Sequence, residues 1–512
     1  MGNLVPSRWG RPLEQYIGDY DIIEARQLFV TVWVDQIQQV KSDIEKVSTV
    51  TDSNHPHNIT ILTLKSILRL SYSPNYLHLL GSPLLFRGCI RLMASVKTSG
   101  KTSPFSYEFG YLCFRILTIS LSVHLLEVGE CLPYTIARML DHLGIETLVT
   151  LSQCIARLMK GLIGHGAGPG RETYNCLFGW STCPKHPTKD IVVTQLDART
   201  LSGILYEDRH AFLKAMASTF SPGLSAVIYL IWRDVCYTRS FNEPCSTKLV
   251  IPFFEIYWRY LLVATDDQYD TLYGIQTWDL EFWRGLKPGS LAADLEESRD
   301  LMQTFINRLT QTAPHLYEPF PLEAITAALY FLSIHAQTGC ESLLPRVLAV
   351  TIERIWDALE RKEESNATSV DIIMGSFDFF GDLLEPLIPE NSLAKEASMM
   401  RVINELVKGN LLDLIGRGIF LLNPVSFDCT AQVAGEEQTR NLNFLRASQS
   451  FCALLPKLAP RAVVDNGFEN LDSVWWRVHR QLQFLEILQP AAKGPTPQSQ
   501  YGFYRYDVPL LV

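Results

Sequence analysis

The sequence predicts an all-α protein built from roughly fifteen to twenty helices. Three observations indicate this fold class. Apolar residues recur at steps of three and four along most of the chain, as they do on the buried face of an amphipathic helix. Short breakers rich in Gly, Pro, Ser and Asn separate these segments. Alternating strand patterns bounded by Asn-Gly or Asp-Gly turns are missing from the sequence.

The first clear helix is predicted near the N-terminus, over residues 29–47. Its apolar stripe is formed by Phe29, Trp33, Ile37, Val40, Ile44 and Val47, and the other faces carry Asp35, Gln38, Lys41 and Glu45. The stripe is shorter than the three to four heptads that a coiled coil needs. We therefore expect this helix to pack onto a neighbouring helix.

Two longer apolar segments are predicted to be buried core helices. Residues 111–129 include Arg115, His124 and Glu127, and the uncharged run 215–232 is broken by Ser-Pro-Gly at 221–223. A membrane-spanning helix needs about 20 apolar residues without such breaks. We therefore expect no membrane span.

The chain is expected to divide into four regions. These are an N-terminal helical region (1–160), an irregular Gly/Cys-rich loop (161–190), a C-terminal helical region (191–489) and a Pro/Gln-rich tail (490–512). The short run "DIVVTQL" at 190–196 is the one segment for which a strand is allowed.

Three segments share one kind of turn. Residues 78–93, 142–159 and, more weakly, 405–422 each end a helix at a glycine and open a second, apolar helix a few residues later. Glycine at a helix C-terminus supplies the left-handed conformation that lets the chain turn. A helix pair that cannot bury its apolar face alone is the unit of a helical solenoid.

These turns, with a glycine before a Leu-Leu or Leu-Val pair, resemble those of armadillo-type helical repeats. The resemblance implies an irregular, armadillo-like α-solenoid that acts as a protein-binding scaffold, and it carries over no catalytic residues. The offset between glycine and leucines varies, and so does the spacing between turns. A non-repetitive helical domain is therefore the alternative.

The composition bounds the partners and the compartment. The formal net charge is -9 and no cluster of Lys and Arg occurs, which argues against nucleic-acid binding. The 11 cysteines are scattered, so we expect a reducing, intracellular compartment, either cytoplasmic or nuclear. The N-terminus lacks the apolar region of a secretory signal. Gly2 is followed by Pro6 where a myristoylation signal has Ser or Thr.

One acidic stretch is a candidate for catalysis. Asp266, Asp267 and Asp270 follow an aromatic segment (253–264) and resemble the DDxxD motif of class I isoprenoid synthases. In that family the motif holds Mg²⁺ that is bridged to a diphosphate, because hard oxygen ligands suit this ion. The second metal motif of the family is not matched at 370–378 or 390–398. Solvated acids in a turn are favoured, and a magnesium-dependent isoprenoid or diphosphate enzyme is the alternative.

The irregular loop holds two weaker candidates. Its glycines at 164, 166 and 168 lack the spacing of a phosphate-binding loop, and Pro169 removes a backbone donor. Possible zinc ligands in the same loop are His165, Cys176, Cys183 and His186. The two cysteines are further apart than in structural zinc sites, so a flexible loop is favoured over a zinc-stabilised interaction domain.

No catalytic, cofactor-binding or metal-ligating residue is therefore assigned, and no cofactor is expected. The sequence favours a non-catalytic helical scaffold or adaptor that offers a groove to a protein partner.

Overall fold

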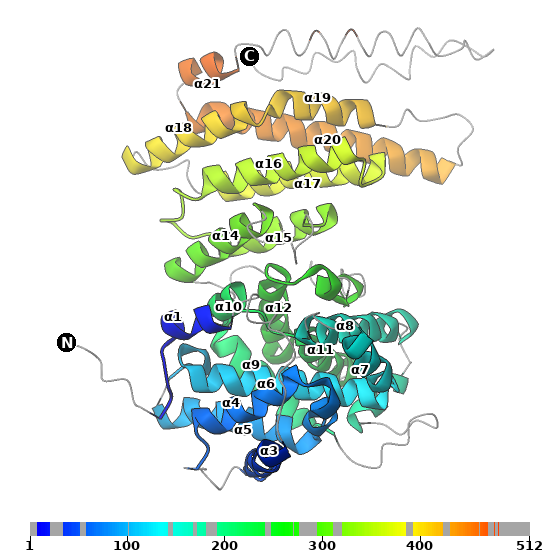
Figure 1. Cartoon of the computed structure of the whole chain (residues 1–512). Helices are drawn as coiled ribbons and strands as arrows, with labels where there is room; N and C mark the ends of the chain where they lie inside the picture. Colours follow the sequence, from blue (N-terminus) through cyan, green and yellow to red (C-terminus); the bar gives the residue numbers. More distant parts are fainter. Residues whose placement is uncertain are drawn as a thin grey trace. The chain divides into compact units, whose positions relative to one another are not determined.

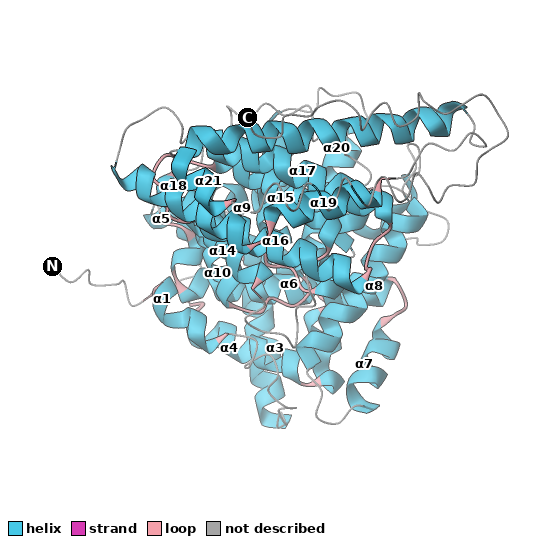
Figure 2. Ribbon diagram, turned by 90° about the horizontal axis from the view of Figure 1, so that it is seen from above, coloured by secondary structure: helices cyan, strands magenta, loops and turns pink. Residues whose placement is uncertain are grey.

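The fold is known from a computed structural model that describes residues 8–20, 34–51, 58–100, 102–141, 147–166, 172–180, 192–240, 247–269, 271–275, 294–310, 320–385, 393–422, 431–459, 461–468, 476 and 480. Within these ranges the chain forms α-helices joined by turns and short 3-10 helices (Figures 1 and 2). Pro12 and Tyr107 make an isolated antiparallel bridge. The predicted all-α class is confirmed over the described residues.

The chain divides into two compact units, Met1–Lys287 and Pro288–Val512. This division differs from the expected one, in which residues 161–190 separated two helical regions. Residues 161–166 are instead the last turns of a helix, and 172–178 form a 3-10 helix within the first unit. The expected tail at 490–512 lies outside the described residues.

The first unit contains the helices from α1 to α12. Their bounds are α1 (Leu13–Tyr16), η1 (Ile17–Asp19), α3 (Val34–Ser48), α4 (Ile61–Arg69), η2 (Leu70–Tyr72), η3 (Pro74–Leu80), α5 (Pro83–Gly100), η4 (Pro104–Ser106), α6 (Glu108–Val128), α7 (Leu132–Asp141), α8 (Thr147–Gly166), η5 (Glu172–Phe178), α9 (Gln195–Glu207), α10 (Arg209–Ser218), α11 (Leu224–Ser240) and α12 (Thr247–Leu261). In α3 the predicted apolar stripe is buried at Ile37, Val40, Ile44 and Val47. Phe29 and Trp33 lie outside the described residues.

Helix α6 is the core of the first unit. It packs against α4, α5, α7, α8 and α11, and every residue from Glu108 to Val123 is buried. A helix that is apolar on all faces needs such an enclosure. Among the described residues α6 alone is long and apolar enough to cross a membrane, and η3 with α5 passes only as a bent pair. The most apolar window of α6 is wholly buried inside the fold.

The strand allowed at 190–196 is wrong. Val192 and Val193 form a bend, and α9 begins at Gln195. Thr194 caps this helix, because its Oγ1 accepts from the Asp197 N–H at 3.0 Å while Asp197 Oδ2 accepts from the Thr194 N–H at 3.3 Å. This reciprocal capping box fixes a helix start.

The second unit contains α14 (Leu295–Leu309), α15 (Leu322–His335), α16 (Leu344–Arg361), α17 (Asn366–Leu384), α18 (Leu393–Lys408), α19 (Leu411–Leu421), α20 (Ala431–Leu458) and α21 (Arg461–Gly467). Its helices pack in two sets. α14 packs on α16 and α16 on α18, while α15 packs on α17 and α17 on α20. Consecutive helices also touch, α14 with α15 and α16 with α17. Within this unit, Figure 1 shows these pairs as successive tiers.

The third predicted glycine turn is confirmed with one difference. α18 ends at Lys408, Gly409 follows, and α19 begins at Leu411. The residue in the left-handed conformation is Asn410, with φ 52°, rather than the glycine. Gly409 is needed for close packing instead, since a Cβ there would lie 3.0 Å from Ile352.

Candidate functional site

The acidic stretch begins directly after α12 in a short helical turn, Asp266 to Tyr269. Thr265 precedes this turn, and the Tyr269 N–H donates to the Thr265 carbonyl at 2.8 Å. The Thr265 N–H donates to Gln268 Oε1 at 3.2 Å. Asp266 and Asp267 are therefore held in the first turn of a helix, where carboxylates complement the helix dipole. Asp270 lies outside the described residues.

This segment is docked on α8. Gln268 Nε2 donates to Ser152 Oγ at 2.8 Å, and Thr271 Oγ1 donates to the Ala156 carbonyl at 3.1 Å. A Cβ at Gly274 would lie 3.0 Å from Ile163. All three partners belong to α8, so the acidic stretch is part of a helix interface.

Asp267 is half-exposed and its Oδ2 is buried, so this residue is less solvated than the expected turn of solvated acids. Its Oδ1 accepts from Thr265 Oγ1 at 2.8 Å. Burial raises the pKa of Asp267, and hydrogen bonds, including those of Thr265 and Ser152, together with the charge of Arg157 oppose this rise. The Asp267 side chain therefore contributes to packing against α8.

The zinc and phosphate candidates fall mostly outside the described residues. Cys176 is fully buried in η5, whereas Cys183, His186 and the side chain of His165 are not described. The zinc hypothesis therefore remains a prediction. Gly164 lies in the last turns of α8, so the glycine run follows a helix and not the strand that precedes a phosphate-binding loop.

A charge network around the buried Glu108, at the start of α6, is a well-defined polar group that sequence reasoning missed. Glu108 accepts from Arg11 Nε and Nη2 at 3.0 and 2.8 Å, and from Tyr20 OH at 2.8 Å. Lys65 Nζ lies 2.8 Å from Glu108 Oε1. Burial alone would raise the pKa of Glu108, but the hydrogen bonds from Arg11, Lys65 and Tyr20 outweigh it and hold the pKa at about 2.

This network ties the N-terminal segment 8–20 to α6. The Glu108 N–H donates to the Arg11 carbonyl at 2.9 Å, and the rings of Tyr16 and Tyr111 stack at 5.0 Å. The fully buried Arg115 lies 5.3 Å from the Tyr20 ring centre. Arg11 and Glu108 are 97 residues apart, and no spacing in the sequence could have paired them.

The second unit presents a helix face with unbalanced charge. Asp371, Asp378 and Asp382 lie exposed along α17, and the exposed Glu385 directly follows its last residue. Asp371 pairs with Arg440 Nε at 3.0 Å. Although Asp378 is exposed, surrounding atoms partly desolvate its carboxylate and raise its pKa, and the neighbouring Asp382 charge raises this pKa further. The pKa of Asp382 is raised by burial and by Glu385. No basic residue lies in the last turn of α17 to offset these charges.

An aromatic pair borders this acidic face. The rings of Tyr330 in α15 and Phe379 in α17 are half-exposed, with their centres 5.7 Å apart. Thr326 meets α17 four residues earlier, where a Cβ on Gly375 would lie 3.1 Å from it. The second contact lies four residues further along both helices than the first, so α15 and α17 run parallel. We call Tyr330, Phe379, Asp378 and Asp382 the α15–α17 face.

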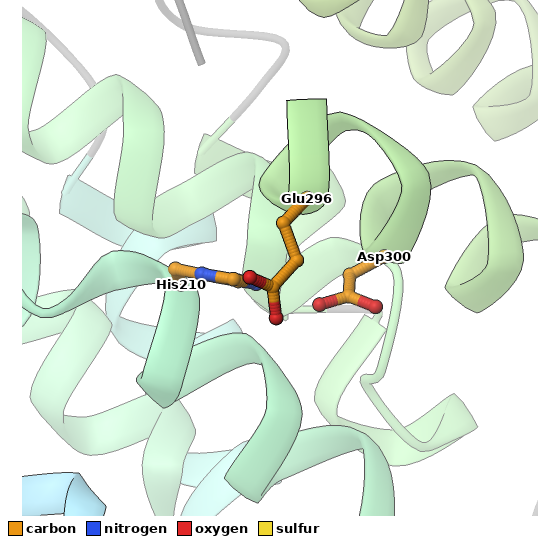
Figure 3. A group of neighbouring side chains, drawn as sticks. All are labelled: His210, Glu296 and Asp300. Carbon is orange, nitrogen blue, oxygen red and sulfur yellow. The ribbon is translucent and has the colours of Figure 1, made fainter. Parts of the chain in front are cut away.

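One further acidic pair lies on α14. Glu296 and Asp300 project from successive turns of this helix in Figure 3, which also draws His210 of α10. His210 belongs to the first unit and the two acids to the second. Neither unit by itself brings the three side chains together, and we assign no metal site to them.

No protein-family model, curated protein or solved structure matches this chain significantly. The functional argument therefore depends on the geometry alone.

Proposed function

We propose that this protein is a non-catalytic helical scaffold or adaptor whose second unit binds a protein partner. One observation carries the proposal, which is the packing of helices that are not consecutive, α14 on α16 and α16 on α18 in one set, and α15 on α17 and α17 on α20 in the other. Stacked helix pairs of this kind generate long surfaces that bind proteins. This packing supports an armadillo-like arrangement of the second unit. We do not extend the armadillo-like arrangement to the first unit, because its central helix α6 is enclosed by other helices on all sides.

The α15–α17 face is the surface on which we expect the partner to bind. Its aromatic rings are half-exposed, and the last turn of α17, which lies beside its carboxylates, contains no basic residue. Aromatic side chains are enriched where proteins bind each other. A carboxylate in the last turn of a helix, as Asp382 is in α17, opposes the helix dipole and costs about 0.3–1 kcal/mol of stability.

The test compares two charge reversals of equal size in the full chain. Partners are identified by affinity capture, produced separately, and their dissociation constants are measured by titration. The variant Asp378→Lys/Asp382→Lys changes the proposed face, and Asp357→Lys/Glu360→Lys changes exposed acids on α16 in the other set of helices.

We expect the α17 variant to weaken binding at least about tenfold and the α16 variant to leave it within about twofold. Equal effects of the two variants would place the partner elsewhere. The scaffold proposal fails if no purified protein binds the wild-type chain directly.

A further inference from the structure

The connection between α9 and α10 in the first unit is a single residue, Asp208. α9 ends at Glu207 and α10 begins at Arg209, so Asp208 occupies the N-cap position of α10. An aspartate at this position usually accepts a hydrogen bond from a backbone N–H of the first turn. The Asp208 side chain makes no such bond. Its carboxylate is therefore free of the usual helix-capping role.

The carboxylate is also buried. Asp208 is 8% exposed, and its Oδ2 is buried without a hydrogen-bond partner. Ser103 Oγ is close enough to act on it, yet that atom too completes no hydrogen bond in the structure. Burial raises the pKa of Asp208 to about 6, against the opposing effects of Ser103 and the Lys97 charge. A buried carboxyl with an unbonded oxygen costs far more free energy when it is ionised than when it is neutral.

Helix α5 and the 3-10 helix η4 pack on this junction. α5 touches α9 and η4, and η4 touches α10. Among the described residues, the elements packed around Asp208 carry charged or titratable groups that include Lys97 of α5, Glu207 of α9, Arg209 and His210 of α10, Asp19 of η1 and Glu255 of α12. Of these, Lys97 is the charge that acts on Asp208, and it is itself ion-paired with Glu207. Among the described residues, the cation that acts on Asp208 therefore shares its charge with Glu207.

We propose that the α9–α10 junction is a pH-sensitive latch, closed against Ser103 and η4 when Asp208 is protonated and loosened when Asp208 is ionised. The neutral carboxyl places no charge in the interior, and its O–H can donate a hydrogen bond to Ser103 Oγ. The ionised carboxylate loses hydration on closing and gains only the partly offset Lys97 charge. Opening the junction returns the carboxylate to water.

The direction of the pH effect follows from the two protonation states. The pKa of Asp208 in the closed junction is about 6, above its ordinary value of 3.8. The closed state is therefore fully stabilised below the ordinary value and loses stability as the pH rises through about 6. With these two pKa values, the equilibrium constant for opening rises about tenfold between about pH 5 and pH 7.

Hydrogen exchange at two amides measures this opening. The Phe212 N–H donates to the Asp208 carbonyl at 2.8 Å, and the Ser106 N–H donates to the Ser103 carbonyl at 3.1 Å. We expect their protection factors, corrected for the intrinsic pH dependence of exchange, to fall about tenfold between about pH 5 and pH 7. The Thr135 amide at the start of α7, bonded to the Cys131 carbonyl at 3.0 Å, is the internal control and should not change.

Two variants decide the proposal. Asp208→Asn keeps the shape but cannot ionise, so protection should be high and independent of pH. Lys97→Gln removes the charge that favours ionisation, so the fall in protection should move to higher pH. The latch is refuted if Asp208→Asn retains the wild-type pH dependence or if the wild type shows none. If Asp208→Asn does not fold, an unmoved transition in Lys97→Gln refutes it instead.

Discussion

Replacing Glu108 by Gln should destabilise the first unit in a pH-dependent way. The substitution keeps the size of the side chain and one acceptor oxygen but removes the charge that Arg11 and Lys65 share. The Glu108 side chain is 3% exposed, whereas Arg11 and Lys65 are 37% and 41% exposed. The two cations can therefore be hydrated after the change, and the loss comes from the missing attraction to a buried carboxylate.

The magnitude follows from the pKa of Glu108, which falls from 4.5 to about 2 in the folded state. Each pKa unit is about 1.36 kcal/mol, so the full difference is about 3 kcal/mol. Solvent around the exposed ends of Arg11 and Lys65 screens part of it, and we expect about 2 kcal/mol at neutral pH. Because the folded pKa is the lower one, this contribution is complete above about pH 4.5 and is lost as the pH falls toward about 2.

Urea unfolding of both proteins measures this difference. Glu14→Gln, an exposed change in the same N-terminal segment, is the control and should lie within about 0.5 kcal/mol of wild type. The destabilisation of Glu108→Gln should shrink between about pH 5 and pH 3. An equal effect at both values, or none at neutral pH, would show that the network does not stabilise the fold through charge.

Two other predictions use glycine positions and the acidic stretch. Gly88→Ala should destabilise the first unit by about 2–3 kcal/mol in urea unfolding, because a Cβ there would lie 2.1 Å from the Val47 carbonyl oxygen of α3. Gly203→Ala in α9, where a Cβ meets nothing within 4 Å, should gain about 0.5–1 kcal/mol, and a loss at both sites would contradict the argument. For the acidic stretch, magnesium with diphosphate should leave the melting temperature of the wild type unchanged. A rise that Asp267→Asn abolishes and Asp43→Asn retains would support the diphosphate enzyme instead.

Helix periodicity was the most informative signal in the sequence. It placed the buried stripe of α3, and the uniformly apolar run in α6 predicted a core helix. At 190–196 the two valines favoured a strand, but the capping box of Thr194 and Asp197 starts a helix there instead. Local sequence also revealed the turn at Gly409, although the left-handed residue proved to be Asn410.

Contacts between distant segments were beyond such reasoning. Arg11, Lys65 and Glu108 belong to three separate elements, and nothing near any of them indicates a partner. Asp208 shows the same limit, because its anomaly is the absence of a hydrogen bond in a buried place. Burial of one side chain depends on which helices meet around it, and pattern within one helix does not give that information.

The enclosure of α6 bears on how the protein is synthesised. α6 packs against α4 and α5, which leave the ribosome before it, and against α8 and α11, which leave after it. The part of its apolar surface that α8 and α11 cover therefore stays exposed until translation has passed Ser240, the last residue of α11. Chaperones bind such exposed surfaces on growing chains. The helix pairs of the second unit can instead be added one after another, each onto a neighbour that has already folded.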